Sequence, residues 1–228
     1  MPAHLFREIE NLKKEILTLG AMAETAVRDA TCAIENRDEA LARRVIDNDI
    51  KLDDMEVQIE ENCLKTLALH QPVAIDLRLI IAVLKINNDL ERVADLAVNV
   101  AERAVFLATQ QRLPMWFNFS QMAEKAQAML HKSLDALVNL DPKLAREVCA
   151  ADDEVDAMNR EAYLQVQDGI RRHPERMEAL IHLLSVSRHL ERLADHATNI
   201  AEDVIYMCEG EIVRHRSEDY LTHPPNRS

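Results

Sequence analysis

The chain has 228 residues, of which 48% are hydrophobic but only 4% are aromatic, so any core must be built from aliphatic side chains. Its formal net charge of −13 disfavours binding to nucleic acid and to anionic lipid, because both are recognised by clustered Lys and Arg. Three glycines and seven prolines are too few for an all-β fold, which needs many tight turns. The acidic balance fits a cationic partner or divalent cations, or it serves only to keep the protein in solution.

The cysteines and the amino-terminal residues favour a cytoplasmic protein. No two cysteines form a CxxC pair and each lies in an apolar helical pattern, so we expect four small buried side chains in a reducing compartment. They are Cys32, Cys63, Cys149 and Cys208. Residues 1–15 carry charges throughout and lack the apolar segment of a signal peptide. No run approaches the roughly 18 to 20 apolar residues that span a bilayer, so we expect the protein to reach a membrane only through a partner.

Hydrophobic residues recur at intervals of three and four along the chain, which is typical of amphipathic helices in a bundle. Gln71-Pro72 predicts a break, because proline disfavours helix in the residue before it. Asp141 and Pro142 predict a helix start, as N-cap and first helical residue, and Gly210 predicts a helix end. We expect helices over residues 4–35, 39–70, 74–111, 120–140, 142–172 and 174–210.

The chain contains a duplicated segment. Residues 91–102 and 191–202, which lie at an offset of 100 residues, are identical at eight of twelve positions, and several of the shared residues are polar. A weaker match relates residues 49–55 to 152–158 at an offset of 103. With short connections that favour antiparallel neighbours, the duplication predicts an all-α fold of two tandem, pseudo-symmetric three-helix bundles. The expected units are a first bundle (1–111), a linker (112–118), a second bundle (119–210) and a polar tail (211–228).

Acidic residues recur at a spacing of four residues in both halves. On a helical wheel they form a stripe just outside the apolar seam, and Glu102 and Glu202 continue it. Two carboxylates at this spacing repel each other by a few tenths of a kcal/mol. A bound cation offsets that repulsion, and hard oxygen ligands suit Mg, Ca, Mn or Fe. The candidate metal ligands are Asp49, Asp53, Glu91, Asp95, Asn99, Asp152, Asp156, Glu191, Asp195 and Asn199.

The alternative interpretation of these residues is a solvated acidic face. In that case Arg92 and Arg192 form ion pairs with Asp95 and Asp195, three residues further along each helix. His196 adjoins one stripe and offers a nitrogen ligand, but its counterpart in the first half is a leucine, so the two halves cannot share it. His70, His182 and His189 are expected at helix surfaces or in packing contacts.

Taken together, several segments resemble the PhoU family over about residues 4–209. They are Leu5–Lys13, Gly20–Glu24, Gln71–Arg78, Asp89–Asp95 and His189–Asp195. The last two match the paired E/D-xxx-D motifs of the family, which bind iron, zinc, manganese or magnesium in some members. The second half has no Asp-Leu-Arg after His173-Pro174, so we expect its site to differ from the first.

The resemblance also implies a function. Members repress phosphate uptake and the phosphate regulon when phosphate is abundant, and they act as adaptors between the phosphate ABC transporter and a sensor histidine kinase. We therefore expect contacts with the nucleotide-binding subunit of the transporter and with the kinase, a homodimer, and no enzymatic activity. The alternatives are a metal-dependent hydrolase or oxidase that uses the carboxylates, and a metal store or sensor.

Overall fold

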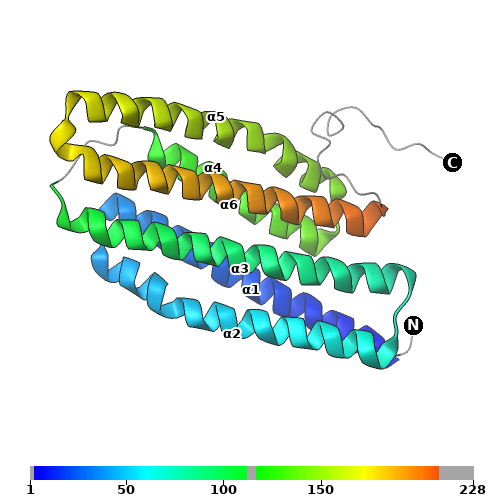
Figure 1. Ribbon diagram of the computed structural model, residues 1–228. Coiled ribbons are helices and arrows are strands. Elements are labelled where there is room, and N and C mark those ends of the chain that lie inside the picture. Colours follow the sequence, from blue (N-terminus) through cyan, green and yellow to red (C-terminus); the bar gives the residue numbers. More distant parts are fainter. Residues whose placement is uncertain (1–2, 112–116, 211–228) are drawn as a thin grey trace.

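The computed structural model describes residues 3–111 and 117–210, and this part of the chain forms six α-helices and one 3-10 turn, without strands (Figure 1). The elements are α1 (Ala3–Asn36), α2 (Glu39–His70), α3 (Ala74–Thr109), α4 (Phe119–Asn139), α5 (Pro142–Arg172), η1 (Pro174–Arg176) and α6 (Met177–Glu209). The predicted linker and tail fall largely on residues 112–116 and 211–228, which lie outside the described residues. None of the described helices is long and apolar enough to cross a bilayer.

Capping residues determine where the helices begin and end. Asp141 accepts hydrogen bonds from two backbone N–H groups of the first turn of α5, and Pro142 occupies the first helical position, as predicted. Gly210 adopts a left-handed φ of 79° at the end of α6, also as predicted. The last α-helix begins three residues later than predicted, because Pro174–Arg176 forms a 3-10 turn first. The third helix ends two residues early, at Thr109.

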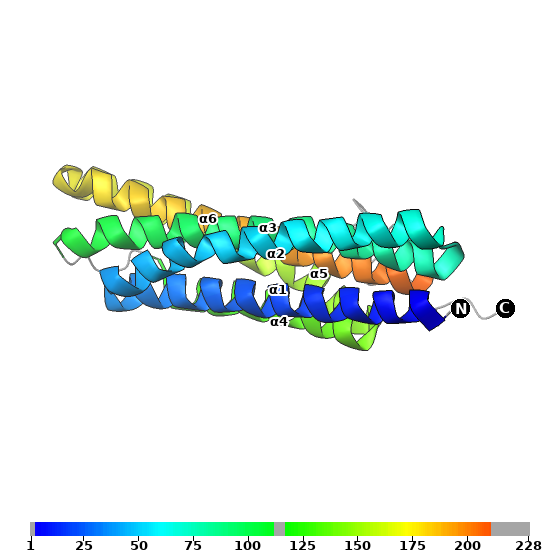
Figure 2. The same ribbon diagram turned by 90° about the horizontal axis from the view of Figure 1, so that it is seen from below.

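The six helices form two layers. In Figure 1, α5, α6, α3 and α2 lie side by side in that order, with α1 and α4 behind them. Figure 2 shows α1 and α4 along one side of the molecule and α2, α3 and α6 along the other. Each back helix packs on two front helices of its own half, α1 on α2 and α3, and α4 on α5 and α6. The four-helix layer therefore presents one long face that neither back helix covers.

Burial confirms the duplication residue by residue. Every described buried position of α2 has a buried counterpart in α5 at an offset of 103 residues. The pairs are Ala42/Ala145, Val45/Val148, Leu52/Val155, Ile59/Ala162, Cys63/Val166 and Thr66/Gly169. In α3 and α6 the offset becomes 100, because matched positions on either side of the turn are three residues closer in the second half: Thr66 and Leu79 correspond to Gly169 and Ala179. The predicted fold class, two pseudo-symmetric three-helix bundles in tandem, is confirmed.

The two halves join where α3 packs antiparallel on α6. At one end of this contact, Lys85 donates to Asp203 over 3.0 Å. At the other end, the ring of Phe106 stacks on His182 with centroids 3.8 Å apart. His189 lies between them, and its burial, with help from nearby arginines, lowers its pKa to about 4. The imidazole is therefore neutral at physiological pH, and the histidine has the packing role that the sequence predicted.

Two predictions about side-chain burial were wrong. Cys63 and Cys149 are buried, but Cys32 is only partly buried and Cys208 is exposed at the end of α6. Glu202 was expected outside the core and is 7% exposed, whereas Glu102 is exposed. Glu202 lies near Cys149, a buried residue of α5, so the neighbouring helix of its own half covers it.

Leu90 and Leu190 are fully buried at equivalent positions of α3 and α6. Replacing either by alanine leaves a cavity, and we expect each change to lower the free energy of unfolding by about 2–5 kcal/mol in urea titrations. Leu69→Ala, at a residue that is 78% exposed, is the control and is expected to change it by less than about 0.5 kcal/mol. A loss below about 1 kcal/mol at either buried leucine contradicts this packing.

Candidate metal centre

The predicted carboxylates of the first half come together in the groove between α2 and α3. Asp49 lies close enough to Asp53, on its own helix, and to Asp95, on α3, for their charges to raise its pKa, although burial is the larger cause. Burial and the charge of Asp95 likewise raise the pKa of Glu91, with smaller contributions from Glu56 and Asp53. The two motifs that the sequence separated by about 40 residues therefore face one another. We call Asp49, Asp53, Glu56, Glu91 and Asp95 cluster 1.

Cluster 2 is the equivalent group between α5 and α6, formed by Asp152, Asp156, Glu191 and Asp195. Burial, followed by the charges of Asp195 and Asp156, raises the pKa of Asp152 to about 6. The pKa of Asp195 also rises to about 6, through desolvation by the surrounding protein and the charge of Glu191. That carboxylate still reaches solvent, so mutual repulsion within the cluster is screened in part.

Both clusters contain a buried oxygen that hydrogen bonding leaves unsatisfied. Asp49 Oδ1 and Asp152 Oδ1, which occupy equivalent positions at the offset of 103 residues, are buried and have no hydrogen-bond partner. A buried acceptor without a partner is costly, and a cation would satisfy both oxygens. The residues therefore fit a hard metal ion. As the side chains stand, no three or more His, Cys, Asp or Glu residues in the described part of the chain already form a ligand set.

The remaining predicted ligands are oriented differently. Asn99 donates to the backbone carbonyl of Asp95 within its own helix. Asn199 donates to Asp89 of α3 over 3.2 Å, and His196 Nδ1 lies 2.8 Å from the same carboxylate. Asn199 and His196 thus contribute to the contact between the halves, and the side-chain hydrogen-bond partner of His196 is Asp89 of α3. This placement was not predicted because it requires α6 to lie beside α3.

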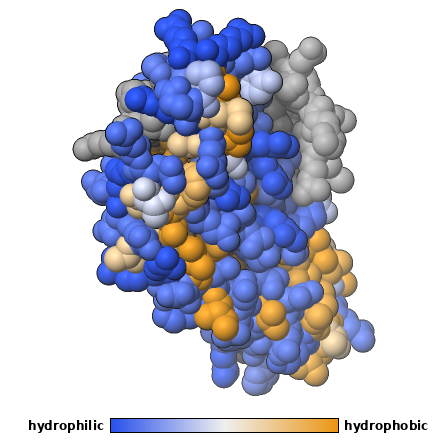
Figure 3. All heavy atoms as spheres, turned by 60° about the vertical axis from the view of Figure 1, so that its left-hand side comes forward, coloured by the Kyte–Doolittle hydropathy of each residue, from blue (hydrophilic) through white to orange (hydrophobic). Residues whose placement is uncertain are grey.

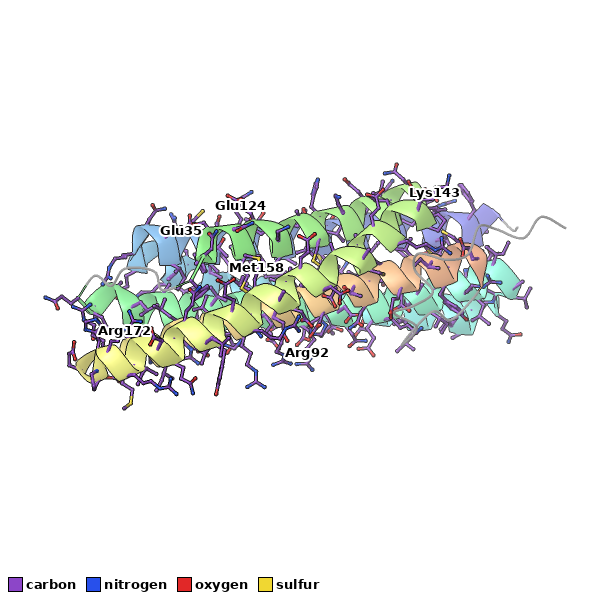
Figure 4. The ribbon with its side chains drawn as sticks, turned by 90° about the horizontal axis from the view of Figure 1, so that it is seen from above. Glu35, Arg92, Glu124, Lys143, Met158 and Arg172 are labelled. Atoms are coloured by element: carbon purple, nitrogen blue, oxygen red, sulfur yellow. The ribbon has the colours of Figure 1, made fainter. Side chains whose placement is uncertain are left out.

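An arginine, Arg92, pairs with two carboxylates of cluster 1. Arg92 forms the predicted ion pair with Asp95 at 3.0 Å and contacts Glu91 at 3.3 Å. Figure 4 shows Arg92 on the side of the molecule opposite Glu35 and Glu124, which is the face formed by α2, α3, α5 and α6. Pairing with arginine lowers the net repulsion but does not exclude a cation.

Sequence analysis missed Glu56. Its carboxylate accepts a hydrogen bond of 2.9 Å from the buried Asn87 of α3 and lies beside Glu91. Extending the offset of 103 would have aligned it with Asn159, which instead accepts a hydrogen bond from Ser187. Cluster 1 therefore has one more carboxylate than cluster 2, in agreement with the expectation that the two sites differ.

Comparison with known proteins identifies the family of this chain. The model of the PhoU domain matches the chain twice, over residues 16–104 and 119–204. The chain belongs to the PhoU family. The PhoU homologue of Aquifex aeolicus, a phosphate-specific transport system accessory protein, is 38% identical over 93% of this chain and 96% of its own length. The Pseudomonas aeruginosa homologue is 36% identical over 91% of this chain and 86% of its own length.

Solved PhoU structures have the same fold. The crystal structure of PhoU from P. aeruginosa superposes with a TM-score of 0.87 at 34% identity, covering 90% of this chain and 99% of that one. The phosphate transport system regulatory protein PhoU from Streptococcus pneumoniae gives a TM-score of 0.81 at 27% identity, covering 92% and 99%. The relatives are thus named for accessory and regulatory roles in phosphate transport, and none of these names describes an enzyme.

The raised pKa values of cluster 2 predict a pH dependence of stability. In the unfolded chain, aspartate titrates near its ordinary value of about 3.9, whereas in the folded protein Asp152 and Asp195 titrate at about 6. Between about pH 4 and pH 6 the folded state therefore binds more protons, and stability contributed by this cluster is lost as the pH rises through that window.

We expect Asp152→Asn/Asp195→Asn to raise the Tm at pH 7.5 in the presence of EDTA and to flatten the dependence of Tm on pH between 4 and 6. The amides carry no charge to repel, so they mimic the protonated carboxyls. Thermal unfolding followed by circular dichroism at pH 4.5, 5.5 and 7.5 measures both effects. Asp47→Asn, at an exposed carboxylate outside both clusters, is the matched control. A double variant less stable than wild type at pH 7.5 would argue against strained carboxylates.

Proposed function

We propose that this protein is an accessory regulator of phosphate transport that represses phosphate uptake and the phosphate regulon when phosphate is abundant. The observation that carries the proposal is its membership of the PhoU family over both repeats, together with relatives named as accessory proteins of phosphate-specific transport systems. In this proposal the protein acts in the cytoplasm as a homodimer, and it reaches the membrane only through its partners.

Its partners are the nucleotide-binding subunit of the phosphate ABC transporter and a membrane sensor histidine kinase. The protein has no chemical step to perform in this role. It needs only to bind one state of the transporter more tightly than the other. The state of the transporter then determines how much of the protein is available to the kinase. The layer of α2, α3, α6 and α5 (Figure 1) supports such a role, since it contains the similar but unequal clusters 1 and 2.

Deleting the gene from its own host should leave phosphate-repressed genes expressed in phosphate-rich medium. Re-expressing the wild-type protein should restore repression, because the adaptor again biases the kinase toward its phosphatase state. A transcriptional reporter and the uptake of labelled phosphate measure the two effects. A deletion strain with normal repression and normal uptake would exclude the proposed role.

Within the same proposal, clusters 1 and 2 bind divalent or iron-type cations: Mg, Mn, Fe or Zn. Support comes from the opposed carboxylates, whose pKa values are raised, and from the unsatisfied oxygens of Asp49 and Asp152. All donors of cluster 1 are oxygens, which suit hard cations. A bound ion would offset part of the negative charge of each cluster and so change the charge of the face on which the partners dock. The fifth carboxylate, Glu56, favours tighter binding at cluster 1.

Metal analysis by mass spectrometry tests the clusters directly. Wild type and a fourfold variant, purified without a His tag, are incubated with each cation and desalted. The variant is Glu91→Gln/Asp95→Asn/Glu191→Gln/Asp195→Asn. Near-integral metal in the wild type alone is expected, because the variant loses the charged oxygens. A negligible metal content in both proteins would mean that the clusters are solvated or bind a partner instead of a metal. Stoichiometric metal without any effect on repression would favour a metal store or sensor.

A further inference from the structure

A stripe of apolar side chains on the outer surface of α2 has no covering element in the described part of the chain. Ile50, Val57 and Leu64 are 65%, 51% and 54% exposed and follow each other at intervals of seven residues. Seven residues are almost two turns of helix, so the three side chains lie in a row about 21 Å long. On the face drawn in Figure 3, most of the surface is hydrophilic and apolar residues gather in patches.

The second half of the chain shows that the fold does not need this stripe. At the offset of 103 residues that matches all the described buried positions of α2 with those of α5, the equivalents of Ile50, Val57 and Leu64 are polar. They are Asp153, Arg160 and Gln167, all exposed. The same structural position therefore accepts an acid, a base and an amide. Since packing does not require apolar residues there, they fit a contact with another molecule.

Carboxylates flank the stripe on both sides. Asp53 and Glu60 lie on the side toward α3, and Asp47 and Asp54 lie on the other, within about 80° of the stripe on the helical wheel. Within residues 3–111 and 117–210, none of these four has an ion-pair partner within 4.0 Å. Glu61 continues the outer row but is paired with Lys65.

The acidic flanks are also specific to the first half. The equivalents of Asp47 and Asp54 are Ala150 and Ala157, and that of Glu60 is Tyr163. Only Asp53 has an acidic counterpart in α5, Asp156. An apolar row between two rows of unpaired negative charge is thus found on α2 and is absent from its duplicate.

We propose that this surface of α2, the stripe with its acidic flanks, docks a basic amphipathic helix of a partner protein. A helix that carries an apolar residue in every seventh position would meet the three side chains in a coiled-coil-like contact. Lys or Arg beside that row would neutralise the unpaired carboxylates. A second copy of the same surface is disfavoured because acid would face acid, and anionic lipid or nucleic acid is disfavoured for the same reason. The inference does not rest on the proposed role in phosphate regulation, because it concerns a binding property of the isolated protein.

The full-length protein and a labelled, designed 22-residue helix test the proposal. The probe has leucines along one face at heptad spacing, with lysines on both sides of them, and fluorescence anisotropy measures its Kd at 50 and 300 mM salt. We expect saturable binding that weakens as salt is raised, because the charges of the flanks are screened. A peptide with glutamates in place of the lysines should not bind.

Three variants separate the contributions. Ile50→Gln/Val57→Gln/Leu64→Gln removes the apolar row and should weaken binding by roughly tenfold or more. Glutamine is a good helix former, so α2 should stay helical. Asp47→Asn/Asp54→Asn/Glu60→Gln should remove most of the salt dependence. The matched control, Phe6→Gln/Val138→Gln/Leu164→Gln, changes three residues of 54–63% exposure elsewhere on the surface and should bind like wild type. Circular dichroism confirms that each variant is folded.

Three results would overturn the proposal. The first is the absence of saturable binding of the basic peptide. The second is equal binding by the stripe variant and the control variant, which would mean that the peptide recognises acidic charge anywhere on the surface. The third is conversion of a wild-type dimer to a monomer by the stripe variant, seen by light scattering, which would assign the stripe to a second copy of this chain. None of these results depends on phosphate signalling, so they are separate from a failure of the proposed function.

Discussion

The antiparallel packing of α3 on α6 is the contact on which the arrangement of the whole molecule depends. It turns two similar three-helix bundles into a single body and places α2 and α5 at the two outer edges of one layer. Its polar contacts differ at the two ends, with Lys85 paired to Asp203 at one and Phe106 stacked on His182 at the other. These end contacts are not equivalent, so the interface between the halves is asymmetric in its side chains although the buried positions of the two halves correspond.

The same contact separates the structural polar residues from the candidate site. On α6, Asn199 and His196 turn toward Asp89 of α3, while Glu191 and Asp195 turn toward α5. One helix thus serves the inter-half contact with one flank and a carboxylate cluster with the other. Holding like charges together has a cost, which appears in the raised pKa values of the clusters and which packing of the aliphatic core offsets.

The fold was predictable because its signals are local or repeated. Breakers such as Pro142 and Gly210, the aliphatic periodicity and the in-step motifs each favoured helices in two matched sets. The facing of Asp49 toward Asp95 followed from assuming that consecutive helices are neighbours. The burial of Glu202 was missed because it depends on how closely α5 covers α6. The orientation of Asn199 was missed because it depends on which helix of the other half packs on α6. A wheel drawn for one isolated bundle carries no information on that contact.

Duplication within one chain also distinguishes residues that the fold requires from those that it merely tolerates. Positions such as Leu52 and Val155 are apolar and buried in both copies, so packing accounts for them. Where the exposed residues differ, as at Val57 and Arg160, packing gives no reason for either choice. The reason must then lie in what the surface meets. On that argument the two edges of the layer have diverged for different contacts, and the edge formed by α2 is the one in which apolar and acidic residues are sorted into rows.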